Sequence, residues 1–155
     1  MPTTKSRVYS AGERGFERPV RLSSLAISPS VEDLSFLESK FKEAHWRLYT
    51  AGTYREALAE LSKKRVPMVF SECQLPDGNW KDVLSRLAAM HERPRLIVFS
   101  RNVDDRLWAE VLNLGGFDLL EAPFREAELV FAIGSAWLDW KSEQEYRQSR
   151  RSAHG

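Results

Sequence analysis

The amino-acid sequence predicts an α/β protein with a doubly wound, five-stranded parallel sheet arranged as a three-layer sandwich. Three observations support this fold class. Short runs of apolar or β-branched residues alternate with longer segments of helical period, the alternation recurs along the chain, and its repeat is roughly 25 residues. Strands that are apolar throughout are buried on both faces of a sheet, and right-handed crossovers place helices on each side.

The predicted strands are short and rich in Val, Ile, Leu and Phe. They occupy residues 22–27, 46–50, 67–71, 96–99 and 117–120. The run 96–99 is the most strand-like, because it is wholly apolar and follows shortly after Pro94. In a parallel sheet, ligand sites lie at the carboxyl ends of the strands, so functional residues are expected directly after each run.

Capping residues indicate where the helices begin and end. The first helix is expected to start after Ser30, an N-cap residue. Its apolar side chains at helical spacing are Val31, Leu34, Leu37 and Phe41. Thr53 and Glu56 form a capping-box pattern ahead of the second helix. Gly115 and Gly116 are expected to end the fourth helix.

Length and composition exclude several classes of protein. A chain of 155 residues with 43% hydrophobic and 29% charged residues fits one ordinary globular domain. The formal net charge of +1 provides no overall field for nucleic acid or an anionic membrane. Cys73 is the only cysteine, so no internal disulfide can form. No apolar run reaches the roughly 18 residues of a membrane span and no signal-peptide pattern is found, so a cytoplasmic location is expected.

Three segments are predicted along the chain. Residues 1–20 are rich in basic side chains and lack apolar periodicity, which indicates a flexible N-terminal tail. Residues 21–141 contain all the strand–helix units and form the predicted domain. Residues 142–155 are a charged C-terminal extension, which is expected to be partly helical as a continuation of the last helix.

Three segments resemble the receiver domains of bacterial response regulators. Residues 69–78, which end in Leu-Pro-Asp-Gly, are similar to the third strand and following loop of that family. Residues 96–100 resemble its fourth strand, and residues 119–124 resemble its fifth-strand motif, which usually ends in Lys-Pro-Phe. The resemblance covers about residues 21–140 and implies a flavodoxin-like fold with strand order 2-1-3-4-5.

The chemistry of the resembled family needs four groups. They are an Asp that ends the third strand and accepts a phosphoryl group, two acids after the first strand that hold Mg²⁺, a hydroxyl on the fourth strand and a Lys on the fifth. The corresponding positions here are Glu72, Ser28 with Pro29, Ser100 and Ala122. Only Ser100 keeps the expected chemistry. Without carboxylate ligands or Lys, phosphoryl transfer loses its charge stabilisation. We therefore expect no phosphorylation of Glu72, no bound metal, no cofactor and no catalytic residue.

Two interpretations of Glu72 remain open from the sequence. Its longer carboxylate could imitate a phosphorylated Asp and hold the domain in one conformation, or it could be a polar residue at a solvated strand end. The second is favoured, because Ala122 supplies no charge to support the imitation. Glu32 and Asp33 are expected at the amino end of the first helix as partners of its dipole, with metal ligation as the alternative.

Aromatic residues indicate where a partner could bind. Trp137 is expected in the core, whereas Trp108 on the fourth helix and Trp140 on the fifth are expected to be partly exposed. The resemblance implies an interface made by the fourth helix, the fifth strand, which contains Leu119, and the fifth helix. The expected partner is a histidine kinase, a downstream regulator or a second copy of the chain. A membrane partner is not expected, and nucleic acid is disfavoured because acids interleave with the basic residues.

The leading hypothesis is a stand-alone, non-enzymatic signalling protein with a degenerate receiver site. One alternative is a response regulator phosphorylated at a nonstandard residue such as Ser71 or Ser100. A second is a nucleic-acid adaptor that uses its basic tails, which predicts binding that weakens steeply with salt. An unrelated flavodoxin-like enzyme is disfavoured, since no Gly-rich phosphate loop and no nucleophile–base pair is found. Cys73 is expected to be an inert thiol, and the histidines lack zinc-ligand spacing.

Overall fold

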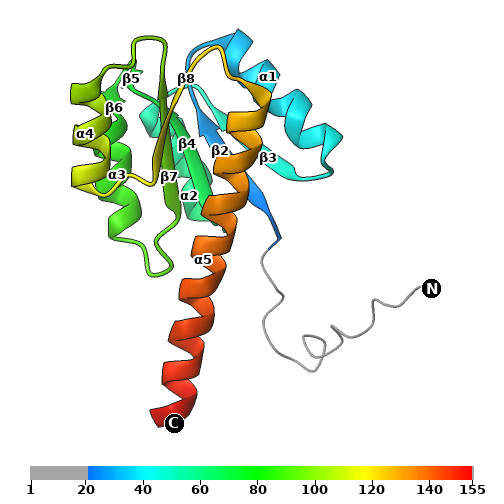
Figure 1. Cartoon of the computed structure of the whole chain (residues 1–155), viewed down its shortest axis with the longest axis vertical. Coiled ribbons are helices and arrows are strands. Elements are labelled where there is room, and N and C mark those ends of the chain that lie inside the picture. The colour runs from blue at the N-terminus through cyan, green and yellow to red at the C-terminus, as the bar shows by residue number, and fades with distance from the viewer. Residues whose placement is uncertain (1–20, 155) are drawn as a thin grey trace.

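The computed structural model describes residues 21–154 and confirms the predicted class, a parallel sheet with helices on both faces (Figure 1). The main sheet contains β2 (Ser23–Ile27), β3 (Arg47–Ala51), β4 (Met68–Glu72), β7 (Arg95–Ser100) and β8 (Asp118–Glu121). The helices are α1 (Val31–Glu43), α2 (Tyr54–Lys63), α3 (Trp80–Ala88), α4 (Asp105–Leu114) and α5 (Glu126–His154). A separate antiparallel pair joins β5 (Gln74–Leu75) to β6 (Gly78–Asn79).

The strands of the main sheet run parallel in the order β3-β2-β4-β7-β8. Counted along the chain, this is the predicted order 2-1-3-4-5. Each strand begins and ends within one residue of a predicted run. The agreement is close because short apolar runs bounded by turn residues are typical of buried strands.

Each face of the sheet is covered by its own set of helices, because alternate residues of a strand point to opposite faces. α2, α3 and α4 pack on one face, around Ile27, Val69 and Val98. α1 and α5 pack on the other, around Phe70 and Phe99. The sheet thus divides the core into two apolar clusters, as a doubly wound fold requires.

Capping interactions set the helix boundaries largely as predicted. Ser30 Oγ accepts a hydrogen bond from the backbone N–H of Asp33 at 3.2 Å, and Thr53 Oγ1 accepts one from Glu56 at 3.0 Å. The Glu56 carboxylate accepts the backbone N–H of Gly52 at 2.8 Å. The second hydrogen bond of the predicted capping box is therefore made to the residue before Thr53. Gly115 ends α4 with φ of 110°, a conformation that glycine adopts without steric penalty.

The buried face of α1 is rotated from the predicted one. Val31 is 77% exposed, so its assignment to the apolar face is wrong. The buried residues are Asp33, Leu37 and Phe41, which share one row because they are spaced four residues apart. A carboxylate therefore takes the place that an apolar side chain was expected to hold.

The candidate interface residues divide between core and surface. Trp108 is exposed, as predicted for the fourth helix. The partial exposure predicted for Trp140 is wrong, because its ring is 3% exposed and its indole N–H donates to a backbone oxygen inside the domain. Leu119 is also buried, so neither residue can anchor a partner on the surface. Trp137 was expected in the core but is only partly buried, and it stacks on Trp140.

The last helix extends well past the sheet. α5 continues without interruption to His154, so residues 142–154 are helical, and its C-terminal part projects beyond the amino ends of the strands (Figure 1). The tail predicted for residues 1–20 lies outside the described residues. Within residues 21–154, none of the helices is both long and apolar enough to cross a membrane.

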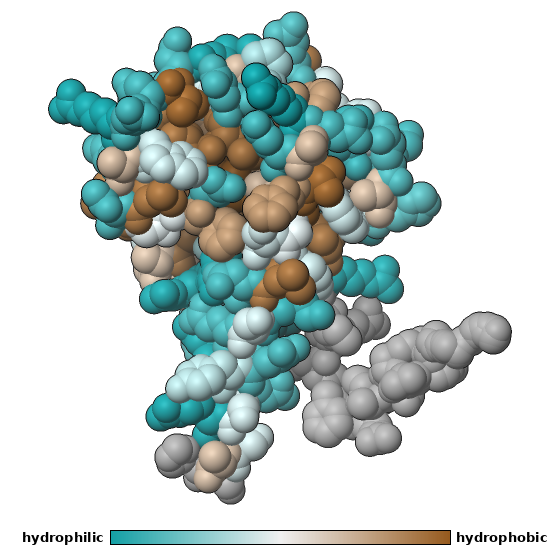
Figure 2. Space-filling view, in the orientation of Figure 1, coloured by the Kyte–Doolittle hydropathy of each residue, from teal (hydrophilic) through white to brown (hydrophobic). Residues whose placement is uncertain are grey.

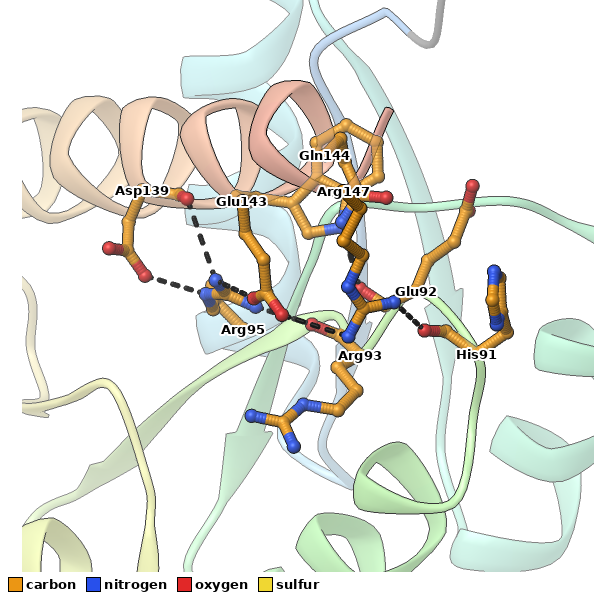
Figure 3. A network of polar contacts seen from close by, with 9 residues as sticks. His91, Glu92, Arg93, Arg95, Asp139, Glu143, Gln144 and Arg147 are labelled. Atoms are coloured by element: carbon orange, nitrogen blue, oxygen red, sulfur yellow. Dashed lines mark hydrogen bonds and ion pairs between the residues drawn. The ribbon is translucent and has the colours of Figure 1, made fainter. Parts of the chain in front are cut away.

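Arg95 is the centre of a polar cluster that holds α5 to the sheet (Figure 3). Its Nε lies 2.7 Å from Asp139 Oδ2, and its Nη2 pairs with Glu143. Partial burial tends to raise the pKa of Glu143, but the hydrogen bond and charge of Arg95, with those of Arg147, outweigh burial and hold that pKa below its ordinary value. The cluster therefore favours the charged form of Glu143.

The same part of α5 binds the backbone of the loop between α3 and β7. Trp140 Nε1 and Gln144 Nε2 both donate to the backbone oxygen of Glu92, at 3.1 and 3.2 Å. One turn further along, Arg147 donates to the backbone oxygen of His91 (Figure 3). These bonds satisfy loop carbonyl groups that would otherwise need water, and they fix the position of α5 beyond the edge of the sheet.

Replacing Arg95 by Met is expected to lower the free energy of unfolding by about 1–3 kcal/mol. Met keeps much of the side-chain volume but leaves the carboxylates of Asp139 and Glu143 without their shared cation. Arg125→Met is the matched control, because Arg125 pairs with Glu128 at 3.8 Å on the open surface and such pairs contribute at most about 1 kcal/mol. Urea unfolding measures both variants, and equal losses would contradict the anchoring role of Arg95.

Candidate functional site at the strand ends

The four positions expected to form the site converge at the carboxyl edge of the main sheet. Ser28 directly follows β2, Glu72 ends β4, Ser100 ends β7 and Ala122 directly follows β8. These strands are neighbours in the order β2-β4-β7-β8, so the four positions form one row along the edge. Ligand sites of open α/β sheets lie at this edge.

Glu72 is bound by a hydroxyl of the neighbouring strand end. Ser28 is fully buried, and its Oγ donates a hydrogen bond to Glu72 Oε1. The same Ser28 oxygen accepts the backbone N–H of Ser30 at 2.9 Å. Glu72 is half-buried, so its carboxylate is held within the chain and is less solvated than the favoured interpretation supposed. The bond also joins the carboxyl ends of β2 and β4.

The ends of the row carry uncharged side chains. Ala122 is buried and belongs to the apolar cluster that contains Phe99 and Phe124. Pro29 is exposed at the opposite end, after Ser28. A Lys at position 122 would have to place its ammonium among apolar groups or reach over them, whereas the methyl group of Ala122 completes the packing.

The two serines considered as alternative phosphoacceptors differ in access. Ser71 is fully buried, and its Oγ donates to the backbone oxygen of Glu72 at 3.0 Å. Ser100 is half-buried, and its Oγ accepts the backbone N–H of Asn102 at 3.1 Å. A serine that satisfies a backbone group two residues away closes a local turn. Ser100 therefore serves the loop after β7 and retains some exposure to solvent.

An ion pair that the sequence did not reveal lies beside this row. Arg101 Nη2 lies 2.8 Å from Asp33 Oδ1 and 3.8 Å from Glu32 Oε1. The Asp33 side chain is 5% exposed, whereas the Glu32 side chain is open to solvent. Glu32 thus lies at the helix end as expected, but Asp33 points inward and forms a buried link to the loop after β7.

The Arg101–Asp33 pair connects elements on either side of β4. Arg101 directly follows β7, and Asp33 lies in the first turn of α1, which follows β2, while β4 lies between those strands. One sequence signal was available: Asp33 shares a row with Leu37 and Phe41, so a buried α1 row would include it. The identity of its partner had no such signal, because Arg101 lies 68 residues away.

The Leu-Pro-Asp-Gly loop also has a structural role. The Asp77 carboxylate accepts the backbone N–H of Tyr54 at 2.7 Å and that of Arg55 at 3.0 Å. Hydrogen bonds from the backbone of Arg55, and then from that of Tyr54, hold the pKa of Asp77 below its ordinary value. Asp77 therefore satisfies two orphan donors at the start of α2 and ties the loop after β4 to that helix.

The thiol beside the row is in its unreactive form. Burial, and then the negative charges of Glu110 and Glu72, raise the pKa of Cys73, so its thiol stays protonated at neutral pH. Among residues 21–154, no three His, Cys, Asp or Glu side chains are grouped closely enough to hold a metal ion. Of the four positions in the row, Glu72 carries the ionisable side chain, and the Arg101–Asp33 pair lies beside it.

The fold and this row of strand-end positions define a receiver-type α/β domain. The response regulator receiver domain family matches residues 32–134, which is more than half of the chain. The chain therefore belongs to that family. The match begins after Ser28 and Pro29, where this sequence departs from the acidic pair of the family pattern.

Solved receiver domains share this fold. The signal receiver domain of an HD domain-containing protein from Pseudomonas fluorescens Pf-5 has a TM-score of 0.72 and 23% identity, covering 79% of this chain and 99% of that chain. That of a putative Luxo repressor protein from Vibrio parahaemolyticus has a TM-score of 0.74 and 19% identity, covering 82% and 98%. The chemotaxis response regulator CheY4 of Vibrio cholerae has a TM-score of 0.68 and 18% identity, covering 76% and 99%. No curated protein sequence matches the chain.

Replacing Asp77 by Ala is expected to lower Tm at neutral pH, because two N–H groups at the start of α2 lose their acceptor. A carboxylate whose pKa is lowered by folding stabilises the protein above its unfolded pKa, and this contribution disappears as pH falls through the folded-state pKa. The Tm difference between wild type and Asp77→Ala should therefore be full near neutral pH and shrink below about pH 4.

Thermal unfolding as a function of pH measures this difference, with Asp105→Ala as the control. Asp105 is an exposed carboxylate in the first turn of α4, where the cap is supplied by Asp104 instead. The control is expected to change Tm much less than Asp77→Ala. A Tm difference for Asp77→Ala that does not depend on pH would contradict the capping role.

Proposed function

We propose that this protein is a non-enzymatic signalling protein of the receiver family that acts without phosphorylation, through contacts with other proteins. The observation that carries the proposal is the state of Glu72, whose carboxylate accepts a hydrogen bond from Ser28 at the position where the family holds Mg²⁺. Glu72, at the phosphoacceptor position, and Ser28, at the position of a metal ligand, are therefore hydrogen-bonded to each other. The buried Ala122 then replaces the cation that would offset a phosphoryl group.

Physical chemistry supports the loss of phosphoryl transfer. The transferred group carries charge that must be stabilised by a metal ion and by cationic side chains positioned in advance. Mg²⁺ needs carboxylate oxygens and a near-octahedral arrangement, whereas Ser28 and Pro29 supply none. Arg101, the cation beside the row, pairs with Asp33. Of the two serines considered as alternative phosphoacceptors, Ser71 is buried and Ser100 is partly exposed at this edge.

The wild-type protein, incubated with Mg²⁺ and acetyl phosphate, is expected to show no mass increase of one phosphoryl group. Beryllofluoride with Mg²⁺ is likewise expected to leave Tm unchanged, because Ser28 and Pro29 provide no carboxylate where the family holds the ion. Intact-protein mass spectrometry and thermal unfolding measure the two results. Phosphate on Glu72, Ser71 or Ser100 would overturn the proposal, as would Mg²⁺-dependent stabilisation by beryllofluoride.

The positive control restores the family's chemistry on the same scaffold. It combines Ser28→Asp, Pro29→Asp, Glu72→Asp and Ala122→Lys, and it is expected to gain a phosphoryl group that the wild type does not take. A known active receiver domain, treated in parallel, checks the reagents if the restored variant proves unstable. This design separates loss of chemistry from failure of the assay.

The surface for protein contacts is proposed to be the α4–β8–α5 face, defined by six exposed apolar side chains. They are Trp108, Leu112 and Leu114 on α4, with Val130, Phe131 and Leu138 on α5. Figure 2 shows apolar side chains gathered over these elements, whereas the projecting part of α5 is largely polar. Exposed apolar side chains that gather over one face in this way favour an interaction site. Trp108 remains a candidate anchor, as expected from the sequence, and we propose Phe131 and Leu138 in place of the buried Leu119 and Trp140.

A groove beside β8 gives this face its shape. It has a volume of about 450 Å³ and is lined by residues of β8 and of the first turns of α5, including Leu120 and Phe131. Phe131 is 74% exposed, so its ring is available to a partner. Aromatic side chains at the centre of such a face supply most of the binding energy of protein interfaces.

A second copy of the chain is the partner that can be tested directly. The wild type is expected to sediment as a concentration-dependent dimer, and the double variant Phe131→Arg with Leu138→Arg as a monomer, because two charges would be desolvated at the interface. Val31→Arg is the control, since Val31 is equally exposed but lies at the start of α1. A dimer that survives the double variant would contradict the α4–β8–α5 face. A wild type that stays monomeric at every concentration would contradict self-association.

A further inference from the structure

We propose that Arg101 is a built-in counter-ion beside the strand-end row, whose guanidinium balances the buried Asp33 carboxylate from within the chain and binds the loop after β7 to α1. The ion pair is the observation behind the proposal, with Arg101 Nη2 at 2.8 Å from Asp33 Oδ1. The proposal goes beyond the proposed function, because it holds whether or not the protein is phosphorylated. It assigns Arg101 a positioning role, in which it acts on the site through Asp33.

The burial of Asp33 makes a counter-charge necessary. Its side chain is 5% exposed and continues the row that Leu37 and Phe41 direct at the sheet. A carboxylate in such surroundings is stable only if it is paired or fully hydrogen-bonded. Asp33 Oδ2 is buried without a hydrogen-bond partner in the described part of the chain. Arg101 therefore has to supply the balancing charge through Oδ1.

The geometry suits a guanidinium that enters from the surface. The Arg101 side chain is 44% exposed, so it remains partly in water while Nη2 reaches Asp33. Glu32 Oε1, at 3.8 Å from the same nitrogen, adds a weaker attraction at the rim. A guanidinium stays charged at neutral pH, so its single bond to Oδ1 brings a full positive charge to the carboxylate. The cation beside Asp33 is thus a side chain of the protein itself.

The pair also positions the segment that leads to the α4–β8–α5 face. Only residues 102–104 separate Arg101 from α4. At the far end of this loop, Asp104 caps the helix by accepting the backbone N–H of Leu107 at 2.8 Å. The loop is therefore fixed at both ends, by Arg101 on α1 and by Asp104 on α4. Release of Arg101 would free the first of these attachments while leaving the helix cap in place.

Chemical rescue tests the proposal. Arg101→Ala is expected to lower Tm by several degrees, and millimolar guanidinium chloride is expected to restore part of that loss by binding at the vacated place beside Asp33. Sodium chloride and magnesium chloride at equal ionic strength should not restore it. Arg106→Ala is the matched control, since Arg106 is an exposed arginine on α4. Guanidinium should not raise the Tm of that control or of the wild type.

Amide hydrogen exchange reports on the positioning role separately from overall stability. In Arg101→Ala, exchange is expected to accelerate in residues 101–108 more than in the rest of the sheet, and guanidinium should slow it again. In Arg106→Ala, exchange in this segment should match the wild type. A uniform acceleration over the whole domain would overturn the positioning role.

A double-mutant cycle keeps the test decisive if Arg101→Ala folds poorly. Once Asp33→Asn has removed the buried charge, Arg101→Ala should lower Tm far less than it does in the wild-type background. Additive losses of Tm would overturn the proposal, as would rescue of Arg101→Ala by Mg²⁺ instead of guanidinium. None of these results depends on a phosphodonor, so this proposal and the proposed function can fail independently.

Discussion

A carboxylate that leaves water needs a counter-charge or hydrogen-bond donors, and this constraint governs the carboxyl edge of the sheet. The hydroxyl of Ser28 donates a hydrogen bond to Glu72, and the guanidinium of Arg101 forms an ion pair with Asp33. In both cases the partner comes from the end of another strand or from the loop after it. Each of these contacts therefore also joins two elements, at the edge of the sheet where related folds bind ligands.

The fold could be predicted from the sequence because its signals are local. A run such as 96–99 identifies a buried strand, and Ser30 and Gly115 mark helix ends through bonds or dihedrals within one turn. In α1, local sequence signals were not enough to predict which side chains are buried. Val31 and Asp33 each belong to a helical spacing that includes Leu37, and hydrophobicity alone predicts that Val31 is the buried residue. The structure buries Asp33 instead, because a cation from a distant loop makes that burial stable.

The site could be predicted in its positions but not in its contacts. Ser28, Glu72, Ser100 and Ala122 follow from where the strands end, which the order of elements along the chain determines. The pairing of Asp33 with a residue 68 positions away, and of Arg95 with one 44 positions away, depends on how α1 and α5 lie across the sheet. No spacing pattern contains that information. The burial of Trp140 could not be predicted for the same reason. It depends on which side of α5 faces the domain, and the contacts of α5 with the loop between α3 and β7 determine that side.

Two arginines at opposite ends of β7 have the same role. Arg95, its first residue, holds α5, and Arg101, the residue after its last, holds α1. These two helices form one layer of the sandwich, so that layer is tied to β7 at both edges of the sheet. Apolar contacts tolerate some sliding and repacking, whereas the directed hydrogen bonds of a guanidinium restrict it. Since β7 also lies between β4, which carries Glu72, and β8, it is the strand that links the strand-end row to the exposed α4–β8–α5 face.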